Sequence, residues 1–493
     1  MPLYNSVPKA RVPRSVFDLS YNVLGTGVMG TIMPVWTQEI LPGDIVSYGV
    51  NALLRCHPLV SPFVHPVDIH FEAFFVPEEL LDADFEKFIT GGEDGLDATV
   101  LDRYDDASTP VRTAGSLYDW FGCPPTIDPD TAHEPRLALW TAYNLIWNTY
   151  YRDQNVDAEV ALDQGALLRR RWPKDYYASA LPWQQRGTAP ALALSGTGNI
   201  DASSAVGGAA TWTVTTNATS QLMASGASAQ LQAALEKQTI DFSDATTFDI
   251  ADLRLALRTQ LILERNARSG ARYTEWLRGA FGVSPRDERM ERPEYLGGFV
   301  TPLITSEVLQ TSESGTTDQG NLAGHGIGTE RRQVFKFRAK EHGWCLGLMS
   351  IIPKAIYQQG LDRHMLRTDR YDFYDPLFAG VSEQAITEAE LYLGTSQANN
   401  DTVFGYQGAW DEYRWRRSIV VGQLRSDHAS TLEHWHLARN FGARPSLNSA
   451  FLECSPDTRV FADETDDGFI INWGNRVRAV RPLPAFAVPG GLV

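Results

Sequence analysis

The clearest pattern along the chain is an alternation of apolar and polar residues between positions 67 and 76. One set of alternate positions is apolar throughout: Val67, Ile69, Phe71, Ala73 and Phe75. The intervening positions, Asp68, His70 and Glu72, are polar, until Phe74 and Val76 make the end of the segment apolar on both faces. A period of two is typical of a strand with one buried face. Together with the upstream turn signal Pro42-Gly43-Asp44, the pattern predicts a protein built mainly from β-strands.

A second alternation runs through residues 334–352. Phe335 and Phe337 fall on one face and Lys336 and Arg338 on the other, before a turn at 341–343. The spacing predicts a β-hairpin over this segment. Residues 476–482 alternate briefly near the end of the chain.

Three segments have the periodicity of helices instead. Residues 133–152 and 249–268 repeat apolar residues at three- and four-residue steps, and a short helix is expected to follow the second and to stop at Gly282. Ser430 and Glu433 form a capping-box pattern, which predicts a helix that begins at Ser430.

Composition supports a folded, acidic protein. The 493 residues contain 43% hydrophobic and 11% aromatic residues, enough for a packed core, and we expect a single domain over 1–493. The formal net charge of −17 excludes a surface that binds nucleic acid as a whole, so any DNA contact must be a local basic patch. The N-terminal segment lacks the apolar stretch of a signal peptide, and no apolar run approaches the roughly 18 residues of a membrane helix. We expect a protein kept in a cytoplasm or in a particle assembled there.

Two basic segments are candidates for such a patch. Residues 1–16 read as an extended arm, because prolines prevent a helix, and the arm carries Lys9, Arg11 and Arg14. It is either simply solvated or reaches enclosed nucleic acid. The second segment interleaves cations with aromatic rings and could follow a phosphate backbone and stack on bases. Its candidate residues are Arg169, Arg170, Arg171, Trp172 and Lys174. The alternative, slightly favoured, is that its aromatic residues pack while its arginines pair with carboxylates.

Residues 188–247 change composition to Gly, Ala, Ser and Thr, which predicts a surface insertion with little core of its own. The chain has no G-x-S-x-G or H-E-x-x-H motif, and the acidic stretch 82–106 lacks the spacing of a calcium loop. Its four cysteines are isolated, which favours free thiols. We expect neither an enzyme nor a bound cofactor or metal. Because carboxylates and tryptophans are abundant, a carbohydrate-active or carbohydrate-binding β-sandwich is the alternative.

A colinear series of short motifs runs from one end of the chain to the other. It includes Phe17-Asp-Leu-Ser20, Gln38-Glu-Ile-Leu-Pro-Gly-Asp44, Asn148-Thr-Tyr-Tyr-Arg-Asp-Gln-Asn155, Arg292-Pro-Glu-Tyr-Leu-Gly-Gly298, Tyr357-Gln-Gln-Gly360, Tyr374-Asp-Pro376, Trp435-His-Leu437 and Val488-Pro-Gly490. In these motifs and their order the chain resembles the major capsid protein of microviruses, especially the gokushovirus-like branch.

The resemblance implies a mainly β fold, an eight-stranded antiparallel jelly roll of the viral capsid type with long loop insertions and a few helices. It implies a structural protein that assembles with itself into a small T=1 icosahedral shell around the single-stranded DNA genome of a bacteriophage. The implied partners are an internal scaffolding protein, a minor pilot protein, a small basic DNA-packaging protein and a host surface receptor. The implied location is the virion, assembled in the bacterial host cytoplasm. The insertion at 188–247 matches in position a variable insertion that forms an outer protrusion in this family.

Overall fold

The structure is a computed structural model, which describes residues 13–92, 96–104, 111–125, 133–190, 214–216, 222–224, 250–269, 272–284, 286–309, 311 and 322–486. The chain divides into two compact units. The first comprises Met1–Gln184 with Ala271–Val493, and the second comprises Gln185–Gly270. Most of the predicted insertion at 188–247 lies outside the described residues.

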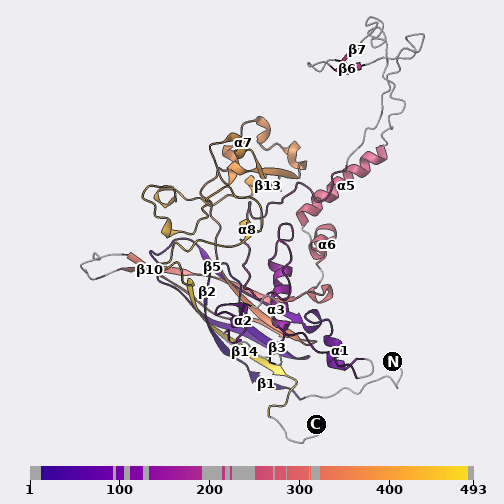
Figure 1. The fold of residues 1–493 in the computed structure, drawn as a ribbon, viewed down its shortest axis with the longest axis vertical. Coiled ribbons are helices and arrows are strands. Elements are labelled where there is room, and N and C mark those ends of the chain that lie inside the picture. The colour runs from indigo at the N-terminus through magenta and orange to yellow at the C-terminus, as the bar shows by residue number, and fades with distance from the viewer. Residues whose placement is uncertain are drawn as a thin grey trace. The chain divides into compact units, whose positions relative to one another are not determined.

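The first unit is built around two antiparallel sheets (Figure 1). In the six-stranded sheet the order is β1-β14-β4-β10-β9, with β2 also paired to β14, and in the four-stranded sheet it is β3-β11-β5-β8. Their strands are β1 (Ser15–Asp18), β2 (Tyr21–Gly27), β3 (Met33–Ile40), β4 (Ile45–Cys56), β5 (Val67–Pro77), β8 (Glu294–Pro302), β9 (Ile304–Leu309), β10 (Leu322–Arg338), β11 (Gly343–Pro353) and β14 (Phe469–Arg481). Successive strands alternate between the sheets from β2 to β5, as in a jelly roll. The prediction of a mainly antiparallel β fold is confirmed.

Each strand buries one face because its apolar residues alternate. In β5 the predicted alternation is confirmed: Phe71 and Phe75 are buried between the sheets, whereas Glu72 on the other face is half-buried. Rings from both sheets fill this core, as where Tyr48 of β4 stacks on Trp36 of β3 with centroids 4.3 Å apart. Interdigitating side chains of two inner faces are the usual core of a β-sandwich.

The four-stranded sheet is covered on its other face as well. Phe74 and Val76, the residues that broke the alternation in β5, pack there with Trp140 and Tyr143 of α3 (Ala138–Ile146). In Figure 1, α2 (Leu117–Trp120) and α3 lie beside β3. Burial on both faces explains why β11 is an almost uninterrupted run of buried residues.

A third group of buried residues lies outside the sandwich. It contains Trp172, Tyr177 and Tyr357 and packs with β12 (Glu383–Thr387) and β13 (Val403–Gly408), which pair with each other. The loops that connect the strands therefore have a core of their own.

The helices are short, with one exception. The remaining α-helices are α1 (Phe85–Thr90), α5 (Ile250–Ser269), α6 (Tyr273–Phe281), α7 (Gln397–Asn400) and α8 (Ser449–Leu452). A π-helix, η3 (Trp147–Tyr151), continues α3. The 3-10 helices are η2 (Glu78–Leu80), η4 (Asp287–Met290), η5 (Arg363–Met365), η6 (Arg370–Asp372), η7 (Pro376–Gly380), η8 (Glu388–Glu390), η9 (Asp411–Tyr413), η10 (Gly422–Leu424) and η11 (Glu433–Trp435). In the second unit, β6 (Val214–Thr216) pairs with β7 (Leu222–Ala224).

Helix predictions at 133–152 and 249–268 are confirmed as α3 with η3 and as α5, and Gly282 caps α6 in the left-handed conformation. The helix predicted from Ser430 is wrong, because only the 3-10 turn η11 forms. In a helix these backbone carbonyl groups would accept hydrogen bonds from backbone amides. Here the Arg459 guanidinium donates to the carbonyls of Glu433 (3.1 Å), His436 (3.2 Å) and Ala438 (2.9 Å).

The predicted hairpin at 334–352 is also wrong. Both strands exist, but β10 pairs with β4 and β9, whereas β11 pairs with β3 and β5 in the other sheet. Ala339, at the start of the connection, is bound to the Gly43–Asp44 turn, and His342, at its end, accepts from the Glu78 amide. Alternation determines which face of a strand is buried and does not determine its partner.

Candidate nucleic-acid interface

The segment Arg169–Lys174 runs in an extended conformation between two other parts of the first unit. The Arg170 amide donates to the Gly30 carbonyl at 2.7 Å, and the Trp172 amide donates to the Leu452 carbonyl at 2.8 Å. Its side chains are therefore held in fixed positions against the four-stranded sheet and the third buried group.

Arg170 makes a bidentate ion pair with Glu72 of β5, with nitrogen–oxygen distances of 3.0 and 3.1 Å. Its Nη1 also donates to Ser350 of β11 at 3.2 Å, and the guanidinium lies 5.2 Å from the centre of the Tyr151 ring. The two charged side chains are 19% and 24% exposed. This arrangement ties the segment to the outer face of the four-stranded sheet.

Arg171 and Arg169 share a second carboxylate. Arg171 lies 2.7 Å from Asp157 and 3.6 Å from Glu453, and Arg169 lies 3.4 Å from Glu453. Arg171 also lies 5.2 Å from the Trp147 ring centre. All three arginines of the cluster are thus paired with carboxylates.

The aromatic residues of the segment are buried. Trp172 is 4% exposed and packs under Arg439, whose guanidinium is 5.1 Å from the Trp172 ring centre. Tyr176 and Tyr177 are also buried. Lys174 is 69% exposed and bonds Asp153 at 3.0 Å. These contacts agree with the alternative in which the aromatic residues pack and the arginines pair with carboxylates. A DNA contact at this segment stays a proposal, and it depends most on the exposed Lys174.

Of the three candidate cations of the basic arm, Arg14 lies within the described residues, whereas Lys9 and Arg11 lie outside them. Strand β1 begins at Ser15 and so includes the last two residues of the predicted arm. Arg14 is exposed and points toward the Gly43–Asp44 turn. Burial raises the pKa of Asp44, while the Leu41 amide, Arg481 and Arg14 oppose that rise. The described end of the arm therefore reaches the turn that precedes β4.

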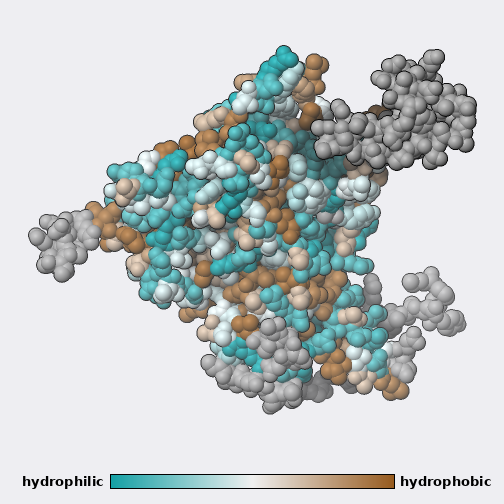
Figure 2. Space-filling view, turned by 45° about the horizontal axis from the view of Figure 1, so that its top comes forward, coloured by the Kyte–Doolittle hydropathy of each residue, from teal (hydrophilic) through white to brown (hydrophobic). Residues whose placement is uncertain are grey.

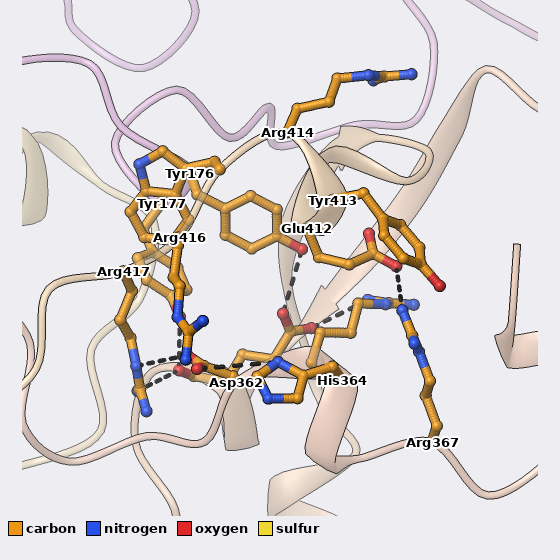
Figure 3. Close-up of a pocket in the computed structure, with 13 residues that line it drawn as sticks. Tyr176, Tyr177, Asp362, His364, Arg367, Glu412, Tyr413, Arg414, Arg416 and Arg417 are labelled. Atoms are coloured by element: carbon orange, nitrogen blue, oxygen red, sulfur yellow. Dashed lines mark hydrogen bonds and ion pairs between the residues drawn. The ribbon is translucent and has the colours of Figure 1, made fainter.

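Another concentration of arginines lines a pocket of about 510 Å³ (Figure 3). Three of them pair with carboxylates that also line the pocket, Arg363 with Glu390 (3.0 Å), Arg367 with Glu412 (3.3 Å) and Arg417 with Asp362 (2.8 Å). Arg414 pairs with Asp411. Burial raises the pKa of Glu390, and Arg363 is the main group opposing it. Because each carboxylate accepts from an arginine, nothing in the pocket favours the carbohydrate-active alternative, which needs one carboxyl group kept protonated as an acid.

Thiol and imidazole groups are held in unreactive forms. Burial raises the pKa of all four cysteines, to about 12 for Cys56 and Cys454, so the thiolate form is disfavoured. His436 donates from Nε2 to the Leu424 carbonyl at 2.6 Å and accepts from the Ala438 amide at Nδ1, while burial lowers its pKa. Among the described residues no group of three or more His, Cys, Asp or Glu side chains is placed to hold a metal ion. No helix within the described ranges is long and apolar enough to cross a membrane.

Sequence reasoning found the arginine cluster but not its partners. Glu72 falls on the polar face of β5, and this position in the sequence pattern is the feature that could have identified it as a partner of the cluster. Asp157 and Glu453 lie on loops distant in sequence, and no periodicity identifies loop contacts.

The model of a family described as "Capsid protein (F protein)" matches residues 5–491. The capsid protein VP1 of Bdellovibrio phage phiMH2K is 33% identical, with 99% of this chain and 97% of the relative covered. The capsid protein VP1 of Chlamydia phage 1 is 30% identical, again over 99% of this chain and 97% of the relative. That of Spiroplasma virus 4 is 28% identical, over 97% of this chain and 95% of the relative.

Proposed function

Because this chain belongs to the capsid protein (F protein) family, we propose that copies of it assemble into a closed T=1 icosahedral shell around a single-stranded DNA genome. It is a structural capsid protein and a component of a phage virion. The observation that carries the proposal is the match over residues 5–491, which includes both sheets and the loops between them. A match of that extent supports a capsid role for the whole chain over a capsid-like fold used for another purpose.

Assembly needs surfaces that other copies can cover. A closed shell joins different patches of the same subunit, and such patches are rich in exposed aromatic and apolar residues. Apolar residues stand among the hydrophilic ones on the face that Figure 2 shows. Around η6 and η7, Tyr371 is 54%, Phe373 55% and Leu377 91% exposed. Exposure of this kind supports a role for these loops in contacts between subunits.

The remaining roles follow from the family and extend the proposal. We expect an internal scaffolding protein and a minor pilot protein to take part in assembly, and a small basic protein to accompany the DNA. We expect the insertion at 188–247 on the outer surface, near where a host surface receptor would bind. The role is non-enzymatic. Limited proteolysis of intact particles should cut within 188–247 before it cuts in β5, whereas early cleavage in β5 would contradict that placement.

The test of assembly is the sedimentation of the native protein from infected cells, followed by negative-stain imaging. The proposal predicts a fast-sedimenting closed particle. A protein that stays a monomer or dimer inside infected cells would overturn it. Hydrolysis of a carbohydrate substrate that is abolished by replacement of one carboxylate would favour the alternative.

A further inference from the structure

The outward face of the six-stranded sheet is open to solvent, unlike the outer face of the other sheet. Residues of β4 alternate between the core and this face, so that Tyr48 and Val50 are buried while Asn51 and Leu53 are exposed. We call the outward positions of this sheet the open face. Pairing in β4 fixes which residues of β10 and β14 share it.

Cations flank the central strand on the open face. Ser47 of β4 lies between Lys336 of β10 and Arg478 of β14. Two residues further along, Gly49 lies between Gln333 and Arg476. Residues two apart on a strand are roughly 7 Å apart, and strands β10 and β14, separated by β4, are about 10 Å apart. The small residues of β4 thus form the floor of a shallow trough with a column of basic side chains on each side.

The charge of the open face is opposite to that of the chain. Its cations are Arg55, Arg331, Lys336, Arg338, Arg476 and Arg478, all exposed. At the described outward strand positions of this sheet the one carboxylate is Asp18, at the rim opposite Arg478, where it accepts from Ser20. In the whole chain Asp and Glu outnumber Lys and Arg by 60 to 43. A surplus of cations on such a background is not what a merely solvated surface would show.

None of these six side chains makes an ion pair with a carboxylate of another described residue. Arg476 donates to the carbonyl of Arg332 at 3.2 Å, and no ion pair with another described residue neutralises it. By contrast, Arg170, Arg171 and Arg363 each bond a carboxylate. The open face therefore has positive charge available for an external anion.

We propose that the open face binds the phosphate backbone of single-stranded DNA. The outward positions of β4, β10 and β14 carry amide and hydroxyl donors such as Asn51 and Asn472 beside the cations, and no phenylalanine, tyrosine or tryptophan ring. Without such a ring to stack on bases, contacts are limited to phosphate and sugar, so binding is tolerant of sequence. The inference deepens the proposed function, on which it rests, because it names the surface that faces the enclosed genome.

A contact with another subunit is the competing use of this face. Covering six unpaired cations with a neutral surface would remove their hydration without compensation, which is unfavourable. The described end of the arm favours DNA as well, because Arg14 directly precedes β1 on the rim of the same sheet. Arg14 therefore adds a cation next to the edge of the open face.

The test compares two triple variants of the full chain that remove equal charge. The open-face variant carries Lys336→Gln, Arg476→Gln and Arg478→Gln. The control carries Lys87→Gln, Lys340→Gln and Arg414→Gln, whose side chains are exposed but paired with Asp84, Glu288 and Asp411. Binding of a short mixed-sequence single-stranded oligonucleotide is measured by fluorescence anisotropy over a range of salt concentrations.

The salt slope is the magnitude of the slope of log K for binding against log salt concentration. Removal of one phosphate contact should lower it by roughly 0.7. The salt slope should therefore fall by roughly 2 in the open-face variant and stay unchanged in the control. An unchanged slope in the open-face variant, or an equal fall in both, would overturn the inference. Should the triple variant unfold, Lys336→Gln with Arg478→Gln avoids the Arg476 hydrogen bond and should lower the slope by roughly 1.4. If the wild type forms closed particles but the open-face variant keeps the wild-type salt slope, this inference alone is contradicted. Failure of the wild type to form particles would sink the proposed function instead.

Discussion

The guanidinium of Arg476 lies over the backbone of Gly49, where an added Cβ would be 2.9 Å from its Nη2 atom. The absence of a side chain at Gly49 lets Arg476 cross from β14 over β4 and donate to the Arg332 carbonyl of β10. One glycine thus positions a cation in the centre of the open face.

Replacing Gly49 with alanine should disturb this arrangement. The new Cβ would also lie 3.0 Å from the Arg332 carbonyl oxygen, so Arg476 must move and give up its hydrogen bond. We expect the free energy of unfolding, measured with urea, to fall by about 1 kcal/mol. Gly442→Ala is the control, since nothing lies within 4 Å of a Cβ there. An equal effect of both substitutions would show that the contact with Arg476 is unimportant.

Arg170 should matter for stability and not for DNA binding. Arg170→Met leaves the Glu72 carboxylate with Tyr151 as its remaining partner. We expect a loss of roughly 2 kcal/mol in unfolding free energy, less than for a fully buried pair because both groups are partly exposed. Lys174→Gln, at a 69% exposed side chain, should change it by less than about 1 kcal/mol. A lower salt slope of DNA binding with unchanged stability in Arg170→Met would instead support the DNA contact at this cluster.

Stability should fall in mild acid because of His65. Its Nε2 donates to the Lys354 carbonyl at 2.7 Å, and its buried Nδ1 has no hydrogen-bond partner within the described residues. Burial lowers the pKa of His65 from 6.5 to about 4, so between these values the unfolded chain binds a proton that the folded chain does not. The stability due to neutral His65 is complete above pH 6.5 and is lost as the pH falls toward 4.

The comparison of wild type with His65→Gln isolates this effect. Between pH 7 and pH 5 the wild type should lose on the order of 2 kcal/mol more than the variant in urea unfolding. His364→Gln, at a 48% exposed side chain, should behave as the wild type does. Parallel pH profiles for wild type and His65→Gln would contradict the assignment.

The arm is expected to contribute to DNA packaging independently of the open face. Neutralising Lys9, Arg11 and Arg14 together should reduce the DNA packaged per particle and lower the salt slope of DNA retention by roughly 2. Filled particles with unchanged DNA content and unchanged salt sensitivity would show that the arm does not bind the genome.

The sequence predicts which residues of a strand share a face, but it does not predict which strands pair with each other. Alternation placed Lys336 and Arg338 opposite Phe335, and it revealed the periodicity that includes Arg476 and Arg478. It could not show that β10 and β14, about 140 residues apart, flank the same strand β4, because register and partner are set by tertiary packing. The error over the hairpin had the same origin. The carboxylate partners of the arginine cluster could not be predicted for another reason. They come from β5 and from loops, and loop contacts have no periodic pattern in the sequence.

The most direct test of the whole account is an electron cryo-microscopy reconstruction of DNA-filled particles. We expect a closed icosahedral shell in which the open face of the six-stranded sheet points inward, with density for nucleic acid along the trough between Lys336 and Arg478. A shell in which this face points outward or is buried between subunits would contradict the proposed DNA surface. The absence of any closed shell would contradict the proposal of a capsid.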